Sequence, residues 1–62
     1  MHIVFYSTSD VFRAEEELQK QNIDCTIVPT PVTDRAYCGV CVQVKDIDVR
    51  KYLRDMEYEI VE

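Results

Sequence analysis

The fold is decided by HIVFYSTSD, residues 2–10, where a strand pattern passes directly into a helix-start pattern. The segment HIVFY is β-branched and aromatic and contains no glycine or proline, which is typical of a buried strand. In the STSD that follows, Ser7 and Asp10 have the spacing of a capping box. The sequence therefore predicts a strand over 2–6 and a helix that begins directly after it.

The helix predicted after Ser7 has an apolar side and a charged side. Val11, Ala14 and Leu18 recur at the spacing of one helical stripe, so we expect them to face the core. The opposite side carries Glu15, Glu16, Gln19 and Lys20. The helix is expected to end near Asn22, because asparagine tolerates the left-handed conformation common just past a helix C-terminus.

The rest of the chain continues in alternating patterns of strand, loop and helix. We predict a strand, a proline-containing loop, a strand, a second amphipathic helix and a last strand, over 23–29, 29–37, 38–44, 45–56 and 57–62. Asp46 or Asp48 is expected to cap the second helix. Its apolar stripe consists of Val49, Tyr52, Leu53 and Met56.

This element order predicts an α+β fold, the ferredoxin-like βαββαβ plait. Such an arrangement keeps both crossovers right-handed and places both helices on one face of a four-stranded antiparallel sheet. The first and third strands are then central. At this length, residues 1–62 form a single domain with a thin core, since so short a chain buries only about 60% of its unfolded surface.

Composition excludes several classes of function. The net charge is −5 and the Lys and Arg residues are scattered, which is unlike a nucleic-acid-binding protein. No apolar run approaches the ~20 residues of a membrane span. The opening residues lack the basic leader and cleavage site of a signal peptide. An odd number of cysteines argues against a disulfide framework, so we expect free thiols and a cytoplasmic location.

Cys38 is the candidate reactive thiol because it ends the loop that the plait topology brings near the start of the first helix. Unpaired N–H groups and the helix dipole there favour an anion, which lowers a thiol's pKa. Arg35 would add positive charge, and Gly39 would leave room for a ligand beside the sulfur. The alternative is that Cys38 is a small buried residue and that Gly39 only relieves crowding.

The remaining metal-ligating and nucleophilic residues are weaker candidates. Cys41 lies three residues beyond Cys38 and should face the other side of the strand, so a disulfide would require a bulge at Gly39. Cys25 is expected to pack against the core. His2 lies at the far end of its strand, so we expect neither a general base for Cys38 nor a zinc site. No metal or cofactor is expected.

Four short segments together resemble a known family. They are FYST, AEEEL, VPTP and CGVCV, at 5–8, 14–18, 28–31 and 38–42. Over Phe5 to Val44 the chain resembles a family of small bacterial domains described as selenium/sulfur carrier-like, sometimes found near genes that handle sulfur or selenium. The resemblance implies that Cys38 is the carrier thiol and that Gly39, Pro29 and Pro31 shape its loop.

The chain departs from that family pattern beside the loop. The family typically has an arginine after the second proline and serines before the cysteine, where this chain has Val32 and the residues DRAY. Arg35 can supply the missing positive charge, and Cys41 is an addition to the pattern. The candidate site comprises Cys38 as the carrier thiol and Gly39, Pro29, Pro31, Arg35, Ser7 and Cys41 as binding residues.

Two functions follow from these residues. In the first, the protein holds a persulfide or perselenide on Cys38 for transfer to a partner protein, without acting as an enzyme in its own right. In the second, it is a non-catalytic interaction module that dimerises through the sheet face opposite the helices. On that face we expect Val4 and Tyr6 alongside Val28, Cys41 and Gln43.

We predict a homodimer, because an apolar sheet face on a small domain usually marks an interface. Light scattering at micromolar concentration should therefore give twice the chain mass, and a charged substitution at Val4 or Tyr6 should abolish the association. A monomeric mass for the unmodified chain would exclude the dimer. The alternative is that Tyr6 and Gln43 are polar enough for this face to remain uncovered.

Overall fold

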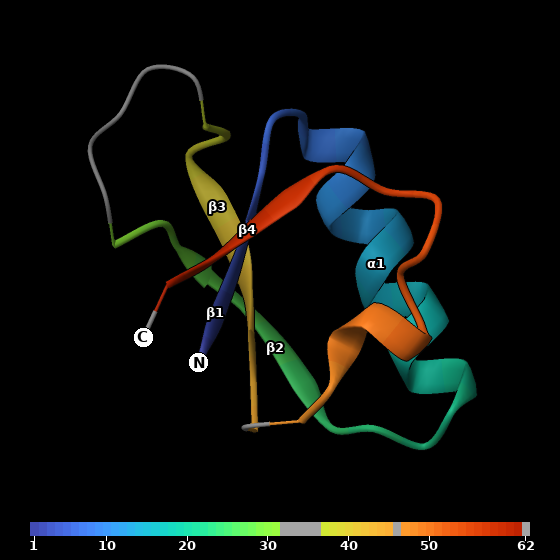
Figure 1. Ribbon diagram of the computed structural model, residues 1–62. Helices are drawn as coiled ribbons and strands as arrows, with labels where there is room; N and C mark the ends of the chain where they lie inside the picture. Colours follow the sequence, from blue (N-terminus) through green and yellow to red (C-terminus); the bar gives the residue numbers. More distant parts are fainter. Residues whose placement is uncertain (32–36, 46, 62) are drawn as a thin grey trace.

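The computed structural model describes residues 1–31, 37–45 and 47–61 (Figure 1). Within these residues the chain is α+β, as predicted. The elements are β1 (His2–Phe5), α1 (Thr8–Lys20), β2 (Cys25–Pro29), β3 (Val40–Val44), the 3₁₀ turn η1 (Val49–Lys51) and β4 (Tyr58–Val61).

The four strands of the described chain form one antiparallel sheet in the order β2-β3-β1-β4. The prediction that the first and third strands are central is therefore confirmed. Ile3 of β1 is paired with Val42 on one side and with Ile60 on the other. Consecutive strands that are not neighbours require crossovers, which α1 and the segment carrying η1 provide.

Helix α1 begins and ends with the capping residues that the sequence predicts. Ser7 is the N-cap, and its side-chain oxygen accepts a hydrogen bond from the N–H of Asp10 at 3.4 Å. At the other end Asn22 has a φ of 60°. The N–H of Ile23 donates to the carbonyl of Leu18 at 3.0 Å, which completes a Schellman motif.

The second predicted helix is wrong: in the described part of the chain, α1 is the only α-helix. The segment after β3 forms one turn, in which the N–H groups of Tyr52 and Leu53 both donate to the carbonyl of Val49 at 2.9 Å. Asp48 caps this turn, accepting from the N–H of Arg50 at 3.3 Å. Asp46, the other predicted cap, lies outside the described residues. The topology is thus βαβββ.

Local chemistry explains why this turn does not extend into a helix. Ile47 and Val49 are β-branched, which lowers their helix propensity. A continued helix would also bring the side chains of Arg50 and Arg54 together on one face, where like charges repel. Leu53 already lies in the core after this single turn, so burial gives no reason for a longer helix.

The main core lies between the sheet and the two crossovers, which cover the same face (Figure 1). Its buried members are Ile3, Phe5, Val11, Ala14, Leu18, Val42, Val44, Val49 and Leu53. Val4 and Cys41 are paired across β1 and β3 on the opposite face, and neither has any solvent exposure in the single chain. The centre of that face is therefore shielded before any second copy binds, and the dimer stays a prediction.

Replacing Leu53 by alanine should destabilise the protein although no helix surrounds it. Leu53 is only 2% exposed, so the substitution leaves a cavity that costs about 2–5 kcal/mol in the free energy of unfolding. Phe12, which is 53% exposed on α1, is the control, and Phe12→Ala should change stability by less than about 0.5 kcal/mol. Urea titration followed by circular dichroism measures the free energy of unfolding of both variants. If Leu53→Ala is as stable as Phe12→Ala, Leu53 does not belong to the core.

Candidate functional site

Cys38 lies where the end of β1 meets the beginning of α1. Its backbone N–H donates to the carbonyl of Phe5, the last residue of β1, with an N···O distance of 2.7 Å. The side chain then reaches Thr8, the first residue of α1, with 3.1 Å between Oγ1 and Sγ. The sequence predicted Cys38 near the start of this helix, and the structure places it there.

Thr30 holds the loop on the other side of Cys38. Its Oγ1 donates to the carbonyl of Cys38 at 2.7 Å, and its N–H donates to the carbonyl of Gly39 at 3.0 Å. Pro29 ends β2 immediately before Thr30, and exposed Pro31 follows it. The two prolines thus flank the residue that fixes the backbone of Cys38 and Gly39.

Hydrogen bonds to the sulfur lower the pKa of Cys38. The hydroxyl of Thr8 has the largest effect, and the N–H groups of Val40 and Gly39 add to it, while partial burial opposes them. A thiolate accepts hydrogen bonds more strongly than a thiol, so these donors favour the charged form. Arg35, the positive charge expected here, lies outside the described residues.

The other two cysteines differ from Cys38 in their surroundings. Burial raises the pKa of Cys25, and the carboxylates of Glu15 and Asp24 raise it further. Burial also raises the pKa of Cys41, whose side chain has no solvent exposure. Cys38 is therefore the one cysteine of the three whose surroundings lower the thiol pKa.

Cys38 and Cys41 belong to different layers of the domain. Cys38 packs against the core on the helix side of the sheet, while Cys41 pairs with Val4 on the opposite face. All three cysteines are free. The alternation of side chains along an extended strand predicted this separation, and the structure confirms it.

Gly39 is exposed, and the position that a side chain would occupy there is open. A Cβ atom built at this position meets no atom within 4 Å, and the φ of Gly39 is not positive. Neither crowding nor backbone conformation therefore requires glycine here. The chain at Gly39, the residue after Cys38, is therefore open to solvent.

The remaining candidates have structural positions away from the sulfur. Ser7 caps α1, and its neighbour Thr8 supplies the hydroxyl that contacts the sulfur. His2 pairs with Gln43 and Val61 at the end of β1 remote from Phe5, so it is not a base for Cys38. Among the residues described, no group of three or more His, Cys, Asp or Glu side chains is arranged to hold a metal ion.

Sequence reasoning missed Thr8 and Thr30. From the sequence, STSD predicts a helix cap and PTPVTDRAY predicts a loop, and neither pattern indicates a contact with Cys38. The available signal was a hydroxyl at the first helical position and another between the two prolines. Cys38 lies 30 residues after Thr8 and 8 residues after Thr30 in the sequence. The contacts therefore become apparent only when the order of the strands is known.

The family follows from a comparison with known protein families. Residues 1–62 match the family described as "Putative Se/S carrier protein-like". The chain belongs to this family. Neither the curated proteins nor the solved structures give a match. Within the described ranges, no helix of this carrier-like chain has the length and apolar character needed to cross a membrane.

Removing the Thr8 hydroxyl should raise the pKa of Cys38 and slow its alkylation at neutral pH several-fold. Thr8→Val retains the shape and removes the donor, whereas Thr8→Ser retains the donor and should preserve the rate. The pH dependence of iodoacetamide labelling, followed by peptide mass mapping, reports Cys38, Cys25 and Cys41 separately. Equal rates for the valine and serine variants would show that Thr8 does not stabilise the thiolate.

Proposed function

We propose that this protein carries sulfur or selenium on Cys38, as a persulfide or perselenide passed between partner proteins. The observation that carries the proposal is the contact between the Cys38 sulfur and the Thr8 hydroxyl, which lowers the pKa of one thiol in three. Membership of the carrier-like family supports the same chemistry. Gly39, the residue after Cys38, is exposed, and no atom lies within 4 Å of the position that its Cβ would take.

Loading is an exchange reaction at sulfur. The Cys38 thiolate attacks the terminal sulfur of a cysteine persulfide on the donor protein, the donor's S–S bond breaks, and the donor thiolate leaves. Cys38 then holds the persulfide, and no external oxidant or reductant is consumed. Delivery reverses the roles: an acceptor nucleophile attacks the terminal sulfur, and Cys38 leaves as the thiolate. Selenium follows the same steps.

A lowered thiol pKa helps in both directions. It increases the fraction of thiolate available for loading, and it makes Cys38 a better leaving group during delivery. His2 lies at the other end of β1, so no histidine in the described chain assists proton transfer at the sulfur. The proposed role is therefore that of a carrier, with catalysis supplied by its partners.

The alternative function, an interaction module that dimerises through the face opposite the helix, depends on an exposed apolar surface. Val4 and Cys41 at the centre of that face have no solvent exposure in the single chain. The carrier function is therefore the one that the site favours.

The carrier proposal predicts that Cys38 gains sulfur from a persulfide donor. After incubation with a cysteine desulfurase and cysteine, intact-mass and peptide mapping should show one added sulfur atom on Cys38. Cys38→Ser should abolish the addition, and Cys25→Ser should not affect it. If the sulfur is found on Cys25 or Cys41, or no sulfur is added to the unmodified protein, the carrier role is wrong.

A further inference from the structure

Thr30 binds two consecutive carbonyl groups beside the Cys38 side chain. Its hydroxyl Oγ1 donates to the carbonyl of Cys38 at 2.7 Å, and its backbone N–H donates to the carbonyl of Gly39 at 3.0 Å. Thr30 is half-buried and directly follows Pro29, the last residue of β2, so the sheet anchors its backbone. One residue at the end of β2 therefore holds both peptide units that follow Cys38.

The direction of a carbonyl fixes the direction of the N–H in the same peptide unit. Both units are trans, so the N–H of Gly39 points opposite to the carbonyl of Cys38. The N–H of Val40 likewise points opposite to the carbonyl of Gly39. Because Thr30 binds the two carbonyls, both N–H groups point away from Thr30.

This arrangement differs from that of a regular strand and suits an anion. Successive carbonyls of a strand point to opposite sides, whereas here the two are bound by the same residue, just before β3 begins at Val40. Successive N–H groups that point to the same side favour negative charge. After the Thr8 hydroxyl, which has the largest effect, hydrogen bonds from the N–H groups of Val40 and Gly39 lower the pKa of Cys38.

The two threonines therefore act on the sulfur in different ways. Thr8 contacts it directly, with 3.1 Å between Oγ1 and Sγ. The hydroxyl of Thr30 instead bonds the carbonyl of Cys38, so it can influence the sulfur only through the peptide unit that it holds.

We propose that Thr30 is a positioning residue for the carrier thiol, because it keeps the N–H groups of Gly39 and Val40 directed at the Cys38 sulfur. Negative charge on this sulfur is then stabilised before it attacks a persulfide donor and again when it leaves during delivery. This inference rests on the carrier function proposed above and extends it by naming a residue that controls the reactivity of the same sulfur.

Three substitutions isolate the hydroxyl of Thr30. Thr30→Val retains the shape of the side chain and the backbone N–H, and removes only the bond to the carbonyl of Cys38. Thr30→Ser retains the hydroxyl. Thr26→Val is the matched control, since Thr26 is exposed on the same strand and pairs with Gln43, away from Cys38.

The pH dependence of iodoacetamide labelling measures the effect, because the Cys38 thiolate displaces iodide and the rate follows the thiolate fraction. Thr30→Val should move the midpoint of the profile to higher pH and slow labelling at neutral pH about twofold. The change should be smaller than that of Thr8→Val, since Thr8 has the largest effect on the pKa of Cys38. Thr30→Ser and Thr26→Val should keep the midpoint of the unmodified chain.

Two further readouts distinguish positioning from a general loosening of the loop. The labelling rate of Cys38 at high pH should not change in Thr30→Val, because the sulfur is fully ionised there in every variant. Cys41, which has no solvent exposure, should stay unlabelled. If Thr30→Val instead exposes Cys41 and accelerates labelling of Cys38 at every pH, Thr30 only holds the loop together and the inference is wrong.

Sulfur loading by a cysteine desulfurase separates this inference from the carrier function. If Thr30→Val has the midpoint of the unmodified chain, while Cys38 of the unmodified chain gains sulfur, the positioning role is wrong and the carrier function stands. If the midpoint moves as expected but Cys38 gains no sulfur, Thr30 positions the N–H groups around the thiol and the carrier function is wrong.

Discussion

The hydrogen bond from the N–H of Cys38 to the carbonyl of Phe5, 2.7 Å long, joins the two halves of this small protein. It ties the end of the loop between β2 and β3 to the end of a central strand, three residues before α1 begins at Thr8. Because of it, Thr8 at the helix start meets a sulfur that is 30 residues distant in sequence. The same bond brings Tyr37 next to Tyr6, and the two ring centroids lie 5.3 Å apart.

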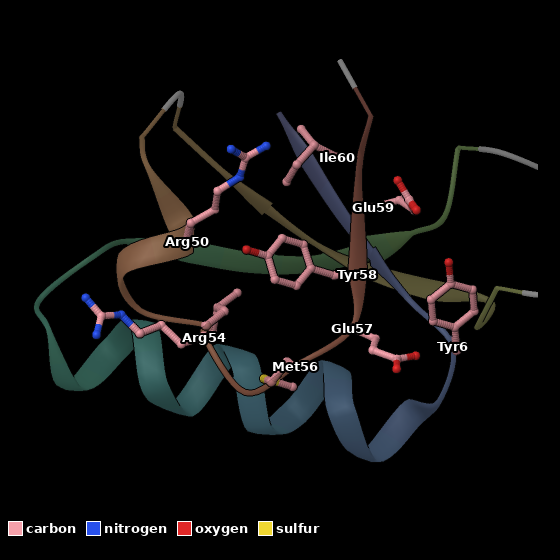
Figure 2. A pocket seen from close by; sticks show the side chains of 9 residues that line it. Tyr6, Arg50, Arg54, Met56, Glu57, Tyr58, Glu59 and Ile60 are labelled. Carbon is pink, nitrogen blue, oxygen red and sulfur yellow. The ribbon is translucent and has the colours of Figure 1, made fainter.

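The core shows how a domain of this size covers a sheet without two full helices. Helix α1 provides Val11, Ala14 and Leu18, while the second crossover contributes Val49 and Leu53 from little more than a single turn. A small domain buries a limited share of its surface, so each of these residues carries a large part of the stability. Because the second crossover is so short, the side of β4 that carries Tyr58 and Ile60 stays partly exposed to solvent beside Arg50 (Figure 2).

The sequence predicts those features that are set by neighbouring residues. Ser7 and Asn22 mark the ends of α1 through their own conformational preferences, and alternation along the strands correctly separates Cys38 from Cys41. The order of the sheet also follows from the sequence of elements. The second helix is predicted because its apolar residues have helical spacing. It does not form, since Ile47 and Val49 are β-branched and have a lower helix propensity. Thr8 and Thr30 escape prediction because their contacts exist only after the sheet has assembled, and the pKa of Cys38 depends on those contacts.

The burial of Cys41 on the opposite sheet face has a consequence for the lifetime of a cargo on Cys38. In many thiol proteins a second cysteine nearby attacks the first and discharges what it holds, leaving an internal disulfide. Here the sheet itself stands between the two sulfurs, and Cys41 is closed to solvent and resists ionisation. Under the proposed carrier function, a chalcogen atom on Cys38 would therefore be protected from attack by Cys41. Its release would then require a nucleophile that another molecule supplies.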